Sequence, residues 1–259
     1  MITHEERLLN DFATRSFRDV ADHDYILARL AYRSELFPQF HWCALQAMEK
    51  YLKAILLYNR IPAKHIYHEI AEAMKLCKKL PFTLSLSSHT NELLEYLDDL
   101  GRFRYLEISY YIHGPKLVAL DKAVWEIRRY CRVLNYEMEV APGKTKNMLS
   151  MELARIAASE KPRHRIFRLI GGVLETIIDR PGHPARGPLL WQNAFFGKRT
   201  RKVVRMRTPF QASNSPLTLN PQILDEVLKY VKLGTDVTNS YRAKLQKQNA
   251  QKAKAANHK

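Results

Sequence analysis

The chain has 259 residues, of which 46% are hydrophobic and 26% charged, so its composition is that of a folded globular protein and excludes a disordered or fibrous one. It contains only 9 glycines and neither a GxGxxG nor a GxxxxGK[ST] sequence, which argues against a glycine-rich phosphate-binding loop. The charged N-terminal sequence and the lack of a long apolar run predict neither a secretory signal nor a membrane span. Cys43, Cys77 and Cys131 lie in apolar helical patterns and are expected to be buried, reduced thiols, as in a cytoplasmic protein.

The net charge is confined to one part of the chain. Residues 1–140, the N-terminal region, contain 19 Lys and Arg and 19 Asp and Glu. Residues 141–259, the C-terminal region, contain 23 and 7, and so carry the whole net charge of +16. A local cationic excess of this size favours a polyanionic partner, nucleic acid above all.

Apolar residues at steps of three and four predict a series of helices in the N-terminal region. The strongest covers 39–58, where Leu45, Met48, Leu52 and Ile55 form the apolar face. The others cover 22–37 (ended by Pro38), 67–79, 90–100 (ended by Gly101) and 115–138. Residues 102–114 fit either a strand or a helix. The sequence thus predicts a mainly α fold with an up-and-down helical bundle over 1–140.

The C-terminal region is predicted to be mixed helical and irregular. A linker at 141–144 precedes helices over 147–158 and 164–179, a proline-rich irregular segment over 180–220, and a helix beginning at Asn220-Pro221. Residues 242–259 are predicted to be a basic, solvated helix or flexible tail. The expected division is therefore 1–140, 141–241 and 242–259.

The densest basic run of the chain follows Trp191, Phe195 and Phe196. Its cations are the candidates for phosphate binding: Lys198, Arg199, Arg201, Lys202, Arg205 and Arg207. We expect the three aromatic rings to pack in the core, although rings beside cations also suit base stacking.

Several motifs of the N-terminal region occur in a fixed order. They are Asp24-Tyr25 with Ala28-Arg29, the helical sequence ALQAMEKYLKA over 44–54, His68-Glu69-Ile70, and Arg102-Phe103-Arg104-Tyr105. This set, spanning about 20–138, resembles the HEPN domain (higher eukaryotes and prokaryotes nucleotide-binding). The resemblance implies a helical bundle that pairs into a homodimer. It also implies one of two roles: a metal-independent ribonuclease of toxin or antiphage systems, or a non-catalytic module that binds nucleotides or partners such as nucleotidyltransferases.

The nuclease branch of that family places a histidine about four to six residues after an arginine, and this chain departs from the pattern. Arg104 and His113 have eight residues between them, and nine helical steps put them on nearly opposite faces unless Gly114-Pro115 interrupts the helix. Arg60 and His65 have the family spacing, but Pro62 lies between them.

We therefore expect a non-catalytic protein that binds RNA, in preference to DNA, through its C-terminal region. The alternatives are a ribonuclease using Arg104 and His113 and a protein-interaction subunit. His68, Arg102, Arg104 and Tyr105 are candidate nucleotide contacts, although His68 could be structural and the arginines could pair with Asp98, Asp99 or Glu107. Glu49, Lys50 and Lys53 are interpreted as a solvated helix face. No metal or cofactor is expected, since His65 and His68 lack carboxylate or cysteine neighbours at ligand spacing.

Overall fold

The structure is a computed structural model of the chain, in which residues 3–64, 66, 69–101, 106–159, 171–197 and 210–256 are described. The protein is mainly helical, with short antiparallel strands, as the sequence predicts. No helix in these ranges is both long and apolar enough to cross a membrane.

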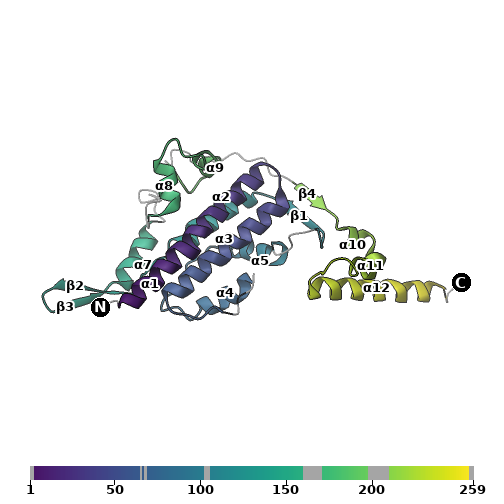
Figure 1. The fold of residues 1–259 in the computed structure, drawn as a ribbon, viewed down its shortest axis with the longest axis horizontal. Coiled ribbons are helices and arrows are strands. Elements are labelled where there is room, and N and C mark those ends of the chain that lie inside the picture. The colour runs from purple at the N-terminus through teal and green to yellow at the C-terminus, as the bar shows by residue number, and fades with distance from the viewer. Residues whose placement is uncertain are drawn as a thin grey trace. The chain divides into compact units, whose positions relative to one another are not determined.

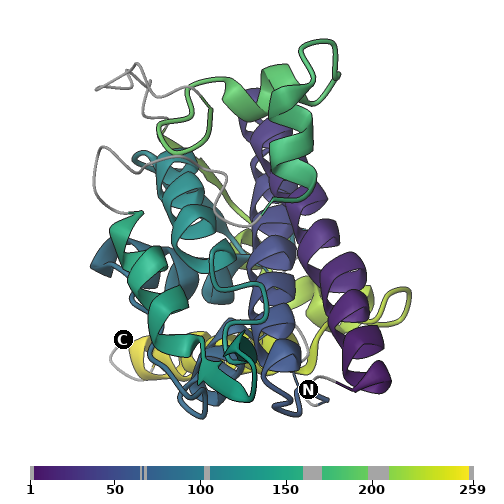
Figure 2. The ribbon, with the colours of Figure 1, turned by 90° about the vertical axis from the view of Figure 1, so that its left-hand side faces the viewer.

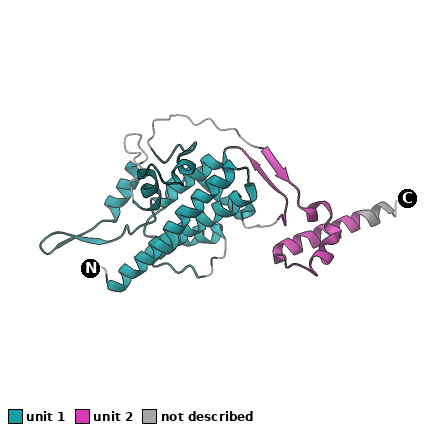
Figure 3. Cartoon of the chain, turned by 45° about the horizontal axis from the view of Figure 1, so that its top comes forward, with its two compact units in different colours: residues 1–102, 115–207 teal, residues 103–114, 208–259 magenta. Residues whose placement is uncertain are grey.

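The chain divides into two compact units, coloured separately in Figure 3. Unit 1 comprises residues 1–102 and 115–207, and unit 2 comprises 103–114 and 208–259. The expected boundaries at 140 and 241 do not coincide with this division. Apolar residues of the C-terminal region, such as Leu174, Leu189 and Phe196, are buried in unit 1 and so complete its core.

Unit 1 begins with one continuous helical rod made of α1 (His4–Phe12), the π-helix η1 (Ala13–Arg18) and α2 (Asp19–Arg33) (Figure 1). Thr3 caps α1 through a reciprocal bond with Glu6. After α2 ends, Pro38 lies in the first turn of α3 (Phe37–Tyr58). Proline therefore starts the next helix here, where its missing N–H costs nothing, instead of ending the preceding one as predicted.

Helix α3 is the centre of unit 1. It lies beside α2 in both Figure 1 and Figure 2, and Leu45, Met48, Leu52 and Ile55 are fully buried, which confirms the predicted apolar face. Helices α4 (Ile70–Cys77) and α5 (Ser88–Leu100) pack against it.

Two segments of unit 1 differ from the sequence prediction. Helix α6 (Lys116–Arg128) ends ten residues before the predicted end at 138, although Cys131 and Leu134 remain buried. The expected linker at 141–144 is a hairpin of β2 (Glu137–Ala141) and β3 (Lys144–Asn147), whose turn uses Gly143 at a φ of +70°. Helices α7 (Leu149–Ala158), α8 (Val173–Asp179) and α9 (Arg186–Leu190) complete the unit.

Unit 2 joins two segments that are distant in sequence. Strand β1 (Tyr110–His113) pairs antiparallel with β4 (Phe210–Ser213), so residues 110–113 of the ambiguous segment 102–114 form a strand. Three short helical segments follow, and then one long helix: α10 (Pro216–Leu219), the 3-10 helix η3 (Pro221–Ile223), α11 (Leu224–Val227) and the long α12 (Thr235–Ala256). A small core joins them, formed by Leu217, Leu224, Val237 and Tyr241. The predicted basic tail is helical as far as Ala256.

Candidate functional site

Most residues that the sequence nominates lie outside the described part of the chain. They are His68, Arg102, Arg104, Tyr105, Lys198, Arg199, Arg201, Lys202, Arg205 and Arg207. Of the predicted catalytic pair, His113 is described. Arg60, which unlike Arg104 has a histidine at the family spacing, donates to the carbonyl oxygens of Leu57 and Glu6, and so holds the end of α3 against α1.

His113 stands on an exposed face of the β1–β4 ribbon. Its ring stacks on that of Tyr111, with centroids 5.5 Å apart and planes 9° from parallel. In the strand register His113 is opposite Phe210 and Tyr111 is opposite Ala212, so these four side chains share one face. Tyr111 is 48% exposed and Phe210 81% exposed.

The opposite face of the ribbon is partly covered, since Gln211 on it is exposed while Tyr110 and Ser213 are half-buried. Ile112 on that face is fully buried, and the hydroxyl of Ser213 donates to the hydroxyl of Tyr110 at 3.3 Å. In a ribbon with one covered face, polar side chains normally occupy the other. Here three rings occupy it, and their contacts within β1 and across to β4 stabilise the two-stranded ribbon.

The charges of the C-terminal region are distributed unevenly between interior and surface. Two of its seven acidic residues, Glu152 and Glu175, are buried and pair with Arg132 and Arg128 of the N-terminal region. Among the described residues, no ion pair joins a cation of the C-terminal region to a carboxylate of the N-terminal region. Glu152 and Glu175 therefore neutralise arginines of the N-terminal region.

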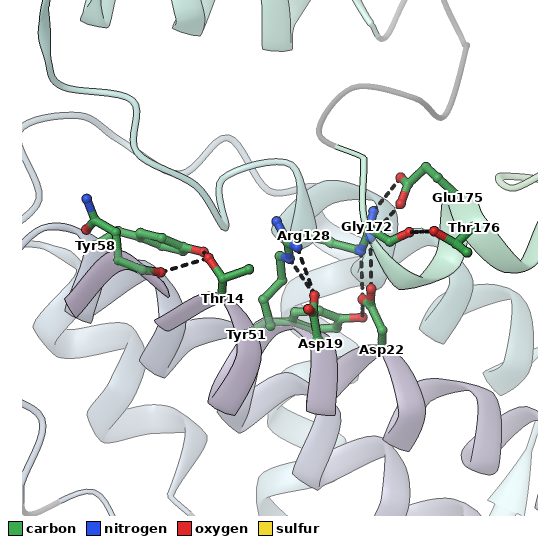
Figure 4. Close-up of polar contacts among 11 residues, drawn as sticks. Thr14, Asp19, Asp22, Tyr51, Tyr58, Arg128, Gly172, Glu175 and Thr176 are labelled. Atoms are coloured by element: carbon green, nitrogen blue, oxygen red, sulfur yellow. Dashed lines mark hydrogen bonds and ion pairs between the residues drawn. The ribbon is translucent and has the colours of Figure 1, made fainter. Parts of the chain in front are cut away.

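Arg128 lies at the centre of a buried ion cluster, drawn in Figure 4. Its guanidinium group makes two bonds to Asp22, of 2.7 and 2.8 Å, and two bonds of 2.7 Å to Glu175. The hydroxyl of Tyr51 donates to the same Asp22 at 2.6 Å. Burial favours the neutral form of Arg128, but the two carboxylates outweigh it and raise the pKa, so the group stays charged.

A second arginine reaches the edge of this cluster from the π-helix. Arg18 donates to Asp19 at 2.9 Å and lies beside Gly172, where a Cβ atom would be 3.0 Å from Arg18 Nη2 and 3.2 Å from Arg128 Nη2. Gly172 also has a φ of +131°, which only glycine adopts readily. Glycine at this position therefore lets both guanidinium groups lie against the backbone at the start of α8.

Helices α2 and α6, which carry Asp22 and Arg128, form a second buried arginine–aspartate pair two turns away. Arg29 of α2 bonds Asp121 of α6, and the hydroxyl of Tyr25 donates to Asp121 at 2.6 Å. Arg29 also donates to the carbonyl oxygens of Pro188 (3.0 Å) and Trp191. Both helices carry an acid followed seven residues later by a base, so the two pairs can form together only when the helices run antiparallel in this register. The bonds from Arg29 also hold residues 188–191 on α2.

A cavity of about 450 Å³ lies between α2, α8 and the segment before α9. It is lined by Asp19, His23, Ile26, Gly172, Val173, Thr176, Ile177, His183 and Ala185. His183 Nδ1 accepts from the backbone of Ala185, and the Thr176 hydroxyl donates to the Gly172 carbonyl oxygen. No group of side chains in the described ranges is arranged to hold a metal ion. The size suits a small ligand, but the mixed lining does not select a ligand class.

Sequence reasoning missed the buried charges. Asp22, Tyr25 and Arg29 follow the i, i+3, i+7 spacing of one helix face, and this spacing of polar residues is the signal that could have found them. Glu49, predicted to be solvated, is buried and pairs with Lys53 at 2.5 Å, while Lys50 pairs with Asp24. Tyr25 and Arg29, part of the HEPN-like motif set, thus have structural roles.

No protein-family model, no curated protein and no solved structure matches the chain. The resemblance to the HEPN domain therefore rests on the sequence motifs.

Proposed function

We propose that this chain is a HEPN-like, non-catalytic RNA-binding protein whose C-terminal region holds RNA phosphates. The observation that carries the proposal is the segregation of charge: the C-terminal region has 23 basic and 7 acidic residues, and two of those acids are buried against arginines of the N-terminal region. A concentrated positive field of this kind costs the compact state electrostatic repulsion, which a polyanion relieves.

Binding of this type is dominated by counterion release, so the salt dependence of the binding constant measures how many phosphates the protein neutralises. If the six cations of the run over 198–207 each neutralise one phosphate of single-stranded RNA, the plot of log K against log salt has a slope of about −4. Such binding depends little on sequence, because phosphates carry no sequence information.

The test uses the full-length chain and a fluorescent single-stranded RNA, with anisotropy measured from about 50 to 300 mM KCl. A variant with Arg201, Lys202, Arg205 and Arg207 changed to Ala should bind more weakly, with a slope flatter by about 3. The control removes four exposed cations of the N-terminal region by changing Lys64, Lys75, Lys78 and Lys79 to Ala. Equal slopes in the unmodified protein and the first variant would refute the proposal. A DNA strand of the same sequence tests the expected preference for RNA.

The ribonuclease alternative is favoured by one observation, the exposed imidazole of His113 on β1. An imidazole side chain can accept a proton from a 2′-hydroxyl or donate one to a leaving oxygen. Incubation of the purified protein with RNA and EDTA decides between the functions. Cleavage that persists in EDTA and stops in His113→Ala supports the enzyme, and intact RNA at high protein concentration supports the binding protein.

The proposal includes a homodimer formed through the helical bundle. Leu27 and Leu30 of α2 lie one turn apart and are exposed, at 52% and 38%. An exposed apolar pair on a long helix is a common feature of a helix–helix contact. Light scattering of the unmodified protein and of Leu27→Glu measures the mass. A dimer that becomes a monomer in the variant is the expected result.

A further inference from the structure

We infer that the β2–β3 hairpin of unit 1, called the arm below, docks on helix α1 of a second copy of this chain. The inference deepens the proposed function and rests on its homodimer, because the arm supplies a contact between the two copies. In a dimer with a twofold axis the copies exchange arms, so the contact occurs twice.

The arm is exposed on both faces. Every residue of β2 and β3 is exposed, and the hairpin is a sheet of only these two strands in the described chain. An isolated two-stranded hairpin is at best marginally stable in water. Its base is nevertheless anchored, because the backbone N–H of Met148 donates to the carbonyl oxygen of Tyr136 at 2.9 Å and the Tyr136 hydroxyl donates to Glu152 at 3.3 Å. A ribbon that is fixed at its base and exposed along its length suits a contact outside its own unit.

The two faces of the arm differ in how their side chains are satisfied. On one face, Glu137 accepts a hydrogen bond from Asn147 Nδ2 at 3.0 Å, and Glu139 accepts one from the backbone N–H of Gly143 at 3.1 Å. The strand register, with a bulge between Glu139 and residue 141, puts the remaining long side chains on the other face, the docking face: Met138, Val140, Lys144 and Lys146.

The docking face combines aliphatic and cationic side chains. Met138 is 42% exposed and Val140 52% exposed, and the two lysines flank them on β3. The complementary surface is therefore apolar and acidic. RNA fits this face poorly, because Met138 and Val140 cannot hold phosphates, and because the two strands carry two glutamates as well as two lysines and so have no net charge.

Edge-to-edge pairing between two arms is also disfavoured. A twofold pairing of β2 with the β2 of another copy places four glutamates beside one another on one face, and a pairing of β3 with β3 does the same with four lysines. Like charges on neighbouring strands are destabilising. The arm of one copy therefore fits a different surface of the other copy.

Helix α1 carries a surface of the complementary kind. It has no buried residue, and Leu8 and Phe12, one turn apart, are 57% and 52% exposed. Glu5 lies one turn before Leu8 on the same side and is exposed. Leu8 and Phe12 are about 6 Å apart along the helix, close to the separation of about 6.6 Å between Met138 and Val140 along β2. The two apolar pairs can therefore pack together while the carboxylate of Glu5 meets a lysine.

The arm and α1 lie at the same end of unit 1. In Figure 1 both are at the left of the unit, and in Figure 2, which faces that side, both are near the bottom. A twofold axis close to this end brings the arm of each copy to α1 of the other. The exposure of the arm shows that it does not cover α1 of its own chain.

Disulfide trapping tests the contact in the full-length protein. Four double variants combine Leu8→Cys or Phe12→Cys with Met138→Cys or Val140→Cys, and copper phenanthroline oxidises them before a non-reducing gel. At least one should form more covalent dimer than the two matching single variants. The three native cysteines are buried and should not react. The control Lys75→Cys with Val140→Cys places a thiol on an exposed side of α4 and should stay monomeric.

Charge reversal tests the lysines of the docking face. In analytical ultracentrifugation, Lys144→Glu with Lys146→Glu should raise the Kd of the dimer tenfold or more, because attraction to α1 becomes repulsion. Adding Glu5→Lys should recover part of this loss. The matched control Glu137→Lys with Glu139→Lys reverses two charges on the opposite face and should leave the Kd unchanged. Circular dichroism checks that the variants fold.

The outcomes separate this inference from the function on which it rests. If the protein is a dimer but no double variant is trapped above its controls and charge reversal leaves the Kd unchanged, the arm contact is refuted while the homodimer stands. A disulfide that forms within one chain also refutes it. If the protein is a monomer at every concentration, the homodimer and the arm contact fail together, whereas RNA binding is judged by its own salt slope. If Lys144→Ala with Lys146→Ala flattens that slope by more than about 1 and leaves the Kd unchanged, the arm binds RNA and the inference is wrong.

Discussion

Replacing Arg128 by Met tests the buried ion cluster of unit 1. The substitution keeps most of the side-chain volume but leaves Asp22 and Glu175 buried, close together and without their cation. Removing one partner of a buried ion pair costs about 3–5 kcal/mol, because the remaining charge is neither hydrated nor compensated. For a unit of about this size, that loss lowers the melting temperature by about 10 °C.

The assay is urea denaturation followed by circular dichroism, with Arg15→Met as the matched control. Arg15 pairs with Asp11 on the surface, where the two side chains are 75% and 54% exposed, so its loss should cost at most about 1 kcal/mol. Adding Asp22→Asn and Glu175→Gln to Arg128→Met should recover part of the loss, because the buried charges are then gone.

The pH dependence of Arg128→Met provides a second check with a definite sign. Its two unpaired carboxyl groups hold protons more strongly in the folded than in the unfolded state, so folding is favoured as the pH falls. The deficit relative to the unmodified protein should therefore shrink between pH 7 and about pH 5. A deficit no larger than that of Arg15→Met would show that the cluster does not stabilise the fold.

Three further predictions concern other buried groups. Burial, with the charge of Lys116, lowers the pKa of His41 from 6.5 to about 4. Below pH 6.5 the unfolded chain therefore binds a proton that the folded chain does not, and the free energy of unfolding should fall by about 2 kcal/mol between pH 7 and pH 5. In denaturation curves, His41→Gln should abolish that part of the loss. Burial raises the pKa of Cys43 to about 11 and that of Cys77 to about 12, and Cys131 is buried as well. After treatment with an alkylating reagent, mass spectrometry should therefore find no alkylated cysteine in the native protein and three in urea. Rapid alkylation of the native protein would contradict the structure. Arg29→Met should open residues 186–197 to trypsin, because the carbonyl oxygens of that segment lose their donor; an unchanged digestion pattern would count against its role.

The sequence predicts the elements whose signals are local. The apolar steps of α3 and the stop at Gly101 are confirmed, since both depend on residues within a few turns. The extent of α6 is not, because Cys131 and Leu134 continue the apolar spacing and are buried although the helix has ended. The three- and four-residue spacing of apolar residues indicates which side chains are buried, but a buried side chain need not belong to a helix.

The candidate site was harder to predict because its parts come from distant segments. The aromatic face exists only because residues 110–113 pair with 210–213, and nothing in either segment alone indicates the other. The charged pairs of Arg29 and Arg128 were missed for a related reason: hydrophobic patterns treat a charged residue as exposed, and these charges are buried only because an opposite charge from another helix meets them.

The interleaved order of the two units has a consequence for how the protein is made. On the ribosome, β1 emerges almost 100 residues before β4, its only strand partner in the described chain. Asp22 and Arg128 are likewise synthesised before Glu175, the third charged residue of their buried ion cluster. The nascent protein therefore cannot finish its first unit and then its second, and must keep early segments unpaired until late ones arrive. A chain truncated between residues 114 and 209 contains β1 but not β4, so it leaves both hydrogen-bonding edges of β1 without the partner strand, which favours aggregation.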